Sequence, residues 1–227
     1  MPHASSPLAL IGGLALIIGA LAFVAVFSYL AARFDYPQVL DGEAEQVLPR
    51  LRSGGSTMRA VWALYAVLPL LLILGAGGVS AALPSSSGLM ALARLFAAVG
   101  ALAMCLGLMR WPSLHWELAR AYESAGPESR HTLSALFRGL NLYLGNYIGE
   151  FLGEVCLAFF FALSGVAMGL DSRYPSWLGL AGALFGLLFF IGALRNITDR
   201  VQWLADINNY LLPLWMIVLG AAVIWRG

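Results

Sequence analysis

Long apolar stretches alternate with shorter polar connections along the whole chain. Six of these stretches are long enough to cross the hydrocarbon core of a bilayer, which takes about 20 residues of helix. They cover roughly residues 7–32, 58–83, 88–109, 137–169, 176–195 and 208–226. The pattern therefore predicts an all-α, polytopic integral membrane protein, with one bundle of six transmembrane helices that takes up residues 1–227.

The connections between the predicted spans are of two kinds. Residues 84–88 and 171–175 contain Pro, Ser, Gly or Asp and are typical of tight turns. Residues 33–57, 110–133 and 196–207 form longer polar connections. Because the two kinds alternate along the chain, we expect all three longer connections on one side of the membrane.

Two of the longer connections contain apolar residues at helical spacing, which predicts two short amphipathic interfacial helices. The apolar residues are Val47, Leu48 and Leu51 in the first and Leu114, Leu118 and Ala121 in the second. Two prolines lie in the spans. Pro69 is expected to kink the second span, and Pro213 to lie in the first turns of the sixth, where a missing N–H costs little.

The composition supports this architecture. Of the 227 residues, 60% are hydrophobic and 11% are charged, whereas soluble domains carry about 25% charged residues. So much apolar surface cannot be buried in one water-facing core, so lipid is the expected solvent and membrane lipid the expected partner. The net charge of +1 gives no reason to expect a nucleic-acid partner.

The arginines give a prediction of orientation. Of the 13 basic residues, all of them arginines, ten lie on the side of the longer connections. The positive-inside rule therefore places those connections in the cytoplasm and both termini outside, in a multi-pass protein of the inner (plasma) membrane. The same connections carry nine of the 12 acidic residues, so they are charged overall and the orientation stays open.

The fourth predicted span begins with an unusual polar face. At about 100° per residue, Asn146 and Glu154 lie within about 40° of Glu150 on either side of it. An ionisable group within a span usually faces protein or water, since lipid contact is costly. Two interpretations stay open: a site for a proton, a cation or another ligand, or carboxylates that pair with arginines of neighbouring spans and hold the bundle together. Gly145, Gly149 and Gly153 form a ridge beside this face and indicate close helix contact.

Further polar residues lie at span ends on the same membrane side. Arg110 or Arg195 is the expected partner of a carboxylate in the fourth span. Counting back about 20 residues from position 169 places Glu150 near the interface and Glu154 about one turn deeper. We therefore predict a vestibule open to one side, with ligand-binding residues Asn146, Glu150, Glu154, Arg110, Arg195, Asn208 and Asn209.

No sequence motif points to a metal, a cofactor or a catalytic residue. His115 and His131 flank the second amphipathic helix without an HExxH or an i, i+4 histidine pair, so solvated or interfacial histidines are expected. Cys105 and Cys156 lie in apolar runs and are expected to be buried small side chains. The chain lacks a GxSxG motif, a P-loop and a GxGxxG motif that follows a strand.

Several short segments resemble one known family. Asn146–Phe151 with Leu140 and Asn141 in the fourth span, Tyr174–Gly186 at the start of the fifth, and Leu212–Gly220 in the sixth are similar to the bacterial domain-of-unknown-function 4386 (DUF4386) family. These are small integral membrane proteins of about this length. The resemblance implies a multi-span helical membrane protein without an established function, and it supplies no catalytic residue.

These observations lead to a ranked set of functions. The leading hypothesis is a protein that binds or transports a small molecule, a lipid or an ion in the one-sided vestibule. One alternative is a membrane-embedded enzyme that uses Glu150 or Glu154 as acid or base on a lipophilic substrate. The other is a non-catalytic regulatory or interaction subunit. The sequence favours binding over catalysis, does not indicate an oligomeric state, and shows no inverted repeat of a secondary transporter.

Overall fold

The computed structural model describes residues 6–226, and all regular secondary structure in that range is helical. Six helices are long and apolar enough to cross a membrane: Pro7–Phe34, Gly55–Ala82, Pro84–Ser124, Pro127–Leu170, Ser176–Asn196 and Asp199–Arg226. Each of them overlaps one of the six predicted spans. The structure thus confirms an all-α polytopic membrane protein.

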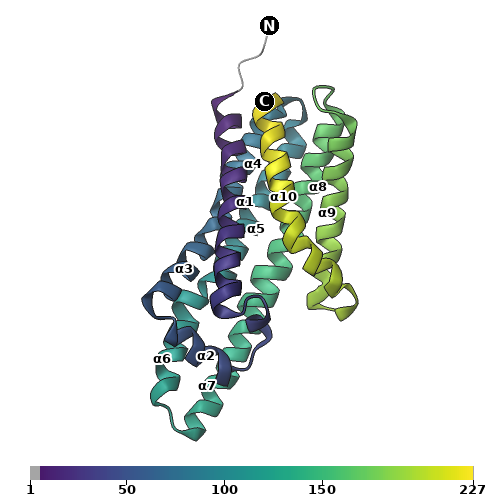
Figure 1. Cartoon of the computed structure of the whole chain (residues 1–227). Coiled ribbons are helices and arrows are strands. Elements are labelled where there is room, and N and C mark those ends of the chain that lie inside the picture. Colours follow the sequence, from purple (N-terminus) through teal and green to yellow (C-terminus); the bar gives the residue numbers. More distant parts are fainter. Residues whose placement is uncertain (1–5, 227) are drawn as a thin grey trace.

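The helices of the transmembrane bundle lie side by side (Figure 1). They are α1 (Pro7–Phe34), α3 (Gly55–Val67), α4 (Leu71–Ala82), α5 (Ser87–Met109), α8 (Gly153–Leu170), α9 (Ser176–Ala193) and α10 (Gln202–Arg226). Helix α1 packs against α4 and α10, α5 packs against α8, and α8 packs against α9. Pro7, Arg226 and the two tight turns lie at one end, the terminal end, and the three longer connections lie at the other, as predicted (Figure 1).

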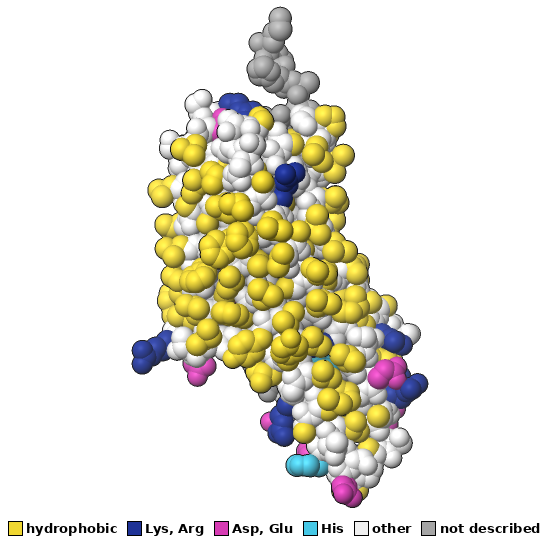
Figure 2. Space-filling model, turned by 180° about the vertical axis from the view of Figure 1, so that it is seen from behind, with side chains coloured by type: hydrophobic (Ala, Val, Ile, Leu, Met, Phe, Trp, Pro, Cys, Tyr) yellow, Lys and Arg dark blue, Asp and Glu magenta, His cyan; other side chains and the backbone are white. Residues whose placement is uncertain are grey.

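The chain forms a separate lobe at the end opposite the termini, which we call the lobe end (Figure 1). The lobe consists of α2 (Ala44–Ser53), α6 (Trp116–Ser124) and α7 (Pro127–Leu140). Helices α2 and α6 are the two predicted amphipathic helices, and Val47, Leu48 and Leu51 lie on the buried side of α2 as predicted. The predicted apolar side of the second was wrong for Leu114 and Ala121, which are exposed, because α6 buries Leu118 with Ala119 and Tyr122 instead. Charged side chains gather on the lobe and at the terminal end, while hydrophobic side chains cover the body between them (Figure 2).

Helix α6 does not lie apart from the third span but continues it. A π-helical segment, Trp111–His115, joins α5 to α6, and a second one, Asn141–Leu152, joins α7 to α8. The resulting helices have 41 and 44 residues, about twice what a bilayer core requires. The third and fourth spans therefore extend beyond the membrane as one helical hairpin.

Buried side chains form two separate clusters. The first fills the transmembrane bundle and includes Leu16, Phe161 and Leu219. The second lies at the lobe end, where the rings of Trp62 and Trp111 stack with centroids 4.7 Å apart. The molecule therefore has one core inside the bundle and another where the lobe joins it.

Two prolines interrupt helices of the bundle. Pro69 lies in a 3₁₀ turn, Leu68–Leu70, between α3 and α4, which confirms the predicted break in the second span. The prediction for Pro213 was wrong, because α10 already begins at Gln202 and Pro213 lies well inside it. Proline has no N–H, so the carbonyl of Asn209 lacks its helical partner. Below this position α10 bends away from α1 (Figure 1).

Helices α8 and α9 are joined by glycines that bring their backbones into contact. A Cβ atom at Gly179 would lie 2.6 Å from the Cα atom of Gly169 and 3.0 Å from the carbonyl oxygen of Gly165. Since the neighbouring atoms belong to the backbone, no side-chain movement can make room for it. Close approach of this kind is how helices associate in lipid, where the hydrophobic effect does not drive them together.

Replacing Gly179 by Val should therefore push α8 and α9 apart. We expect Gly179→Val to lower the free energy of unfolding by about 1–3 kcal/mol or more, the usual range for overpacking. The measurement is the thermal unfolding midpoint in detergent, followed by tryptophan fluorescence. Gly77→Val is the matched control, because a Cβ atom at Gly77 meets nothing within 4 Å. Equal effects of the two substitutions would contradict the packing argument.

An ion pair ties the two tight turns together at the terminal end. Arg173 Nη2 lies 2.7 Å from Asp171 Oδ2 and also donates to the carbonyl oxygen of Ala82 at 2.6 Å. Ser85 Oγ lies 3.4 Å from the same Asp171 oxygen. The hydrogen bonds from the Arg173 guanidinium lower the pKa of Asp171 below its usual value. The pair thus links the turn after α4 to the turn after α8.

The lowered pKa of Asp171 determines how the stability of the protein changes with pH. A carboxyl whose pKa is lower in the folded state stabilises the protein above its ordinary pKa of 3.8, and that contribution is lost as the pH falls below it. We expect Asp171→Asn to cost about 1 kcal/mol near neutral pH, allowing for the exposure of Arg173. Unfolding midpoints measured across this pH range should converge for the variant and the wild type at acid pH. A constant difference between them would contradict the assignment.

Candidate functional site

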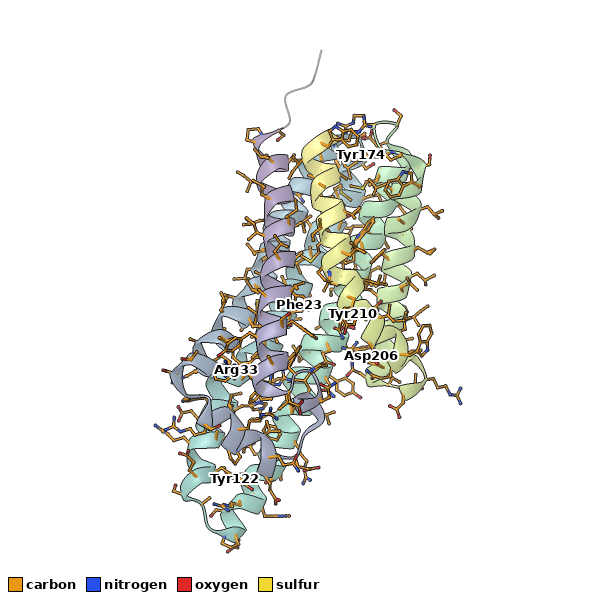
Figure 3. The ribbon with its side chains drawn as sticks, in the orientation of Figure 1. Phe23, Arg33, Tyr122, Tyr174, Asp206 and Tyr210 are labelled. Atoms are coloured by element: carbon orange, nitrogen blue, oxygen red, sulfur yellow. The ribbon has the colours of Figure 1, made fainter. Side chains whose placement is uncertain are left out.

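A cavity of about 640 Å³, here called the vestibule, opens at the lobe end between the two cores. All six spans contribute to its wall, and residues 36–40 and 196–199 lie at its rim. Phe23 and Asp206, which both line it, lie where α1 and α10 diverge (Figure 3). The volume falls within the range of about 300–1,000 Å³ that small-molecule sites occupy.

The structure brings six of the seven predicted site residues to this cavity. They are Arg110, Asn146, Glu150, Glu154, Arg195 and Asn209. Asn208 is not among the lining residues. It is buried against α9, where its side-chain amide donates to the carbonyl oxygen of Leu188 at 3.2 Å. Asn208 therefore joins two helices, and Asn209 is the one of the pair that reaches the vestibule.

Arg195 holds both carboxylates of the fourth span. Its Nη1 and Nη2 donate to Glu154 at 2.6 and 2.8 Å, and Nη2 also donates to Glu150 at 3.0 Å. The three side chains are only 14%, 18% and 26% exposed for Arg195, Glu154 and Glu150. The bidentate contact with Glu154 is the strongest common geometry for an Arg–carboxylate salt bridge. We call this group the Arg195 clamp, and it matches the predicted pairing with an arginine of a neighbouring span.

Arg110 has a different environment. Only 3% of it is exposed, yet none of the acidic side chains that the structure describes lies within 4.0 Å of its guanidinium. Its Nε donates to Asn141 Oδ1 at 3.1 Å and its Nη1 donates to the carbonyl oxygen of Gly107. Asn141 in turn donates to the carbonyl oxygen of Leu40 at 2.6 Å. Arg110 is thus held in place by neutral acceptors at the edge of the vestibule.

The backbone around Arg110 and Glu150 is unusual in both spans. Each side chain lies in or beside a π-helical segment, and the N–H of His115 donates to the carbonyl oxygen of Arg110, five residues earlier, at 2.7 Å. π-Helical turns are rare in proteins and frequent at functional sites. A wider helical turn changes which side chains face the cavity, so the angles expected for a regular α-helix do not apply between Asn141 and Leu152.

Small residues of the predicted ridge create the space for this arrangement. A Cβ atom at Gly149 would lie 2.9 Å from the Cα atom of Gly107, so the two spans touch through their backbones. A Cβ atom at Gly145 would collide with the guanidinium of Arg110, 3.1 Å from its Nε. The ridge therefore does more than the predicted helix packing, since Gly145 provides room for a buried arginine.

Several residues of the vestibule did not stand out in the sequence. Tyr36 and Tyr65 line the cavity, and burial raises the pKa of Tyr36 to about 12. Tyr36 therefore keeps its proton at physiological pH and can donate a hydrogen bond. At the rim lie three polar residues of the last connection and the start of α10: Asp199, Gln202 and Asp206. The sequence feature that could have identified these residues was their spacing around the start of a helix.

The histidine prediction was wrong for His115. This residue is fully buried in the lobe-end core, with its ring centroid 4.7 Å from those of Trp111 and Phe137. The described part of the chain has no group of three His, Cys, Asp or Glu side chains placed to hold a metal ion. Cys105 and Cys156 are buried free thiols, as predicted.

The Arg195 clamp leads to a testable prediction. Arg195→Gln removes one partner of a largely buried ion pair, which typically costs about 3–5 kcal/mol because the remaining charges lose their compensation. We expect the unfolding midpoint in detergent to fall accordingly. Replacing Glu150 and Glu154 by Gln as well should restore most of the loss. A triple variant as unstable as Arg195→Gln would show that charge pairing is not what the arginine supplies.

Comparison with known proteins gives one match. A family model described as Domain of unknown function (DUF4386) covers residues 11–225, nearly the whole chain. No curated protein and no solved structure gives a significant match. The matched range includes the Arg195 clamp, Arg110 and all six spans except the first residues of the first span and the last residue of the sixth. This chain therefore belongs to the DUF4386 family of membrane proteins, which agrees with the resemblance in its fourth, fifth and sixth spans.

Proposed function

We propose that this membrane protein binds a small molecule in the vestibule. The observation that supports the proposal is the cavity itself, which is about 640 Å³ in volume and has one polar and one apolar part. Sites for small molecules typically combine an apolar wall with a few converging polar groups. Arg110, Asn146 and Arg195 are the polar groups that we assign to ligand contact, together with Glu150, Glu154 and Asn209.

The ligand enters from the lobe end in this proposal. Close backbone contacts seal the other end of α1, since a Cβ atom at Gly12 would lie 2.6 Å from the backbone nitrogen of Gly78, and one at Gly13 would lie 2.7 Å from the carbonyl oxygen of Gly220. The excess of arginines at the lobe end would place the mouth of the vestibule in the cytoplasm, in a protein of the inner membrane. Ligand would then exchange with the cytoplasmic side.

Binding is better supported than catalysis. A carboxylate that acts as acid or base must reach the substrate with a free oxygen or proton. Both oxygens of Glu154 accept hydrogen bonds from Arg195, at 2.6 and 2.8 Å, so Glu154 is not free for that task. Glu150 is partly engaged, since its Oε2 accepts a hydrogen bond from the same arginine at 3.0 Å.

Transport is a second candidate, and one feature favours it. Pro69 interrupts the second span between α3 and α4, where the chain lines the vestibule. Interrupted helices commonly surround the sites of transporters. Movement of a ligand across the membrane would require α1 to separate from α4 and α10 at their glycine contacts.

Filling the vestibule should abolish binding. Leu72 lines the cavity, and we expect Leu72→Trp to reduce co-purifying small molecule by at least about tenfold, since the larger ring takes up the space. The measurement is native mass spectrometry of protein extracted in mild detergent. Leu74→Trp on the same helix is the matched control, because Leu74 is 48% exposed on the outer face. Equal unfolding midpoints would establish that both variants fold.

A second measurement tests the vestibule without a ligand. Cys105 and Cys156 are buried, so a variant with both replaced by Ala provides a background for Asn146→Cys. We expect this cysteine to react with a water-soluble maleimide in intact folded protein, because Asn146 lines the cavity. An unreactive cysteine, together with the absence of any bound species in the wild type, would contradict the proposed function.

A further inference from the structure

We infer that the ligand of the vestibule is an amphiphile with one oxyanion head group, a carboxylate or a phosphate, which binds Arg110 while its chain lies along the apolar inner wall. This inference rests on the proposed function and names the chemical class of the ligand. Its basis is the pairing of charges in the vestibule and the position of the apolar residues.

Arg110 is the group that needs an anion. Its guanidinium is buried, and two of its nitrogens donate to neutral oxygens of Asn141 and Gly107. Among the groups that the structure describes, its Nη2 has no hydrogen-bond acceptor, and the residue lines the cavity. A buried charge is unfavourable when no counter-charge makes direct contact with it. The planar fork of an arginine fits carboxylate and phosphate oxygens, and these would supply the missing partner.

Glu150 attracts Arg110 electrostatically, but no acidic residue of the described vestibule lining forms a salt bridge with it. Glu150 and Glu154 are engaged by Arg195 in the clamp. Asp199 and Asp206 line the rim and are exposed, and Asp206 accepts a hydrogen bond from Gln202 at 2.9 Å. Water already solvates these two rim carboxylates, so they do not require a cationic ligand. The described lining of the vestibule has four carboxylates and two arginines. A preference for an anion must therefore come from the buried position of Arg110 and not from the overall potential.

The apolar part of the wall indicates a chain attached to the head group. It lies on the bilayer side of the Arg195 clamp, with Leu157 about one helical turn deeper than Glu154. Its residues come from four of the spans: Gly19, Phe23, Leu72, Leu157, Leu212 and Met216. A head group at Arg110 would therefore lie near the membrane interface and its chain would point to the bilayer interior. This is the orientation of a lipid in the leaflet at the lobe end.

The vestibule also offers neutral donors beside Arg110. Tyr36 and Tyr65 line the same cavity, and Tyr36 keeps its hydroxyl proton at physiological pH because burial raises its pKa to about 12. Asn146, on the fourth span, supplies a further amide. An oxyanion has several lone pairs, so it can accept hydrogen bonds from such donors in addition to the guanidinium.

The test uses full-length protein in nanodiscs of zwitterionic phosphatidylcholine and four labelled probes of equal chain length: tetradecanoate, tetradecyl phosphate, tetradecanol and tetradecyltrimethylammonium. We expect saturable binding of the two anions, at least about tenfold tighter than the neutral and cationic probes. Arg110→Gln should weaken binding of the anions by about ten- to a hundredfold, and Arg110→Lys by less.

Arg59→Gln is the matched control. Arg59 lies at the same end of the bundle and its Nε donates to the carbonyl oxygen of Pro112 at 2.9 Å, but it does not line the vestibule. We expect this variant to bind the anions as the wild type does. The comparison of the four probes on wild-type protein needs no variant, so it tests the inference even if Arg110→Gln does not fold.

The outcomes separate the inference from the proposed function. Equal affinity for all four probes, or unchanged binding of the anions by folded Arg110→Gln, would overturn the inference and leave a binding vestibule in place. If butyrate bound as tightly as tetradecanoate, the chain would not contribute to affinity. That result would overturn the inference of an amphiphilic ligand and would indicate a water-soluble oxyanion. Loss of all probe binding with a reactive Asn146→Cys would overturn the inference alone. Loss of all binding with an unreactive cysteine would overturn the proposed function as well.

Discussion

The backbone contact between Gly107 and Gly149 determines how Arg110 and the carboxylates of the fourth span lie relative to each other. It brings the third and fourth spans together at the level where both become π-helical, with Arg110 about one turn beyond the contact and Glu150 directly beside it. A larger residue at either position would separate the two spans. The hydrogen bond from Arg110 to Asn141 and the space left by Gly145 would then be lost together. A contact between two residues without side chains thus sets the geometry of the polar ones.

Arg110 and Arg195 both lie close to the carboxylates of Glu150 and Glu154. Only Arg195 forms salt bridges with them. Arg195 comes from the end of the fifth span and takes both Glu150 and Glu154, while Arg110 stays with neutral oxygens. This unequal sharing keeps the cavity open, since a symmetric arrangement of two arginines and two carboxylates would fill the space between them. The wall of the vestibule thus contains one group of paired charges, the Arg195 clamp, and one arginine, Arg110, that can still bind an anion.

The architecture and most of the candidate site could be predicted from the sequence. Span length, the break at Pro69 and the polar face of the fourth span are all local patterns. The pairing of Arg195 with the carboxylates also followed from chain order, since both lie at the same membrane end. The missed features depend on contacts between distant segments. Tyr36 reaches the vestibule from a connection, and His115 is enclosed by rings of the lobe-end core. Asn208 faces α9 because α10 starts several residues earlier than its apolar pattern indicates.

The unbroken course of the third and fourth helices into the lobe has a mechanical consequence. Arg110 and Glu150 lie on the same two rods that carry α6 and α7 outside the membrane. A rod that pivots where Gly107 meets Gly149 moves its two ends in opposite directions, so a tilt of the lobe changes the separation of the groups just beyond the pivot. The lobe is therefore a lever arm whose short end is the wall of the vestibule. A load on the lobe from the aqueous phase would therefore change the position of Arg110.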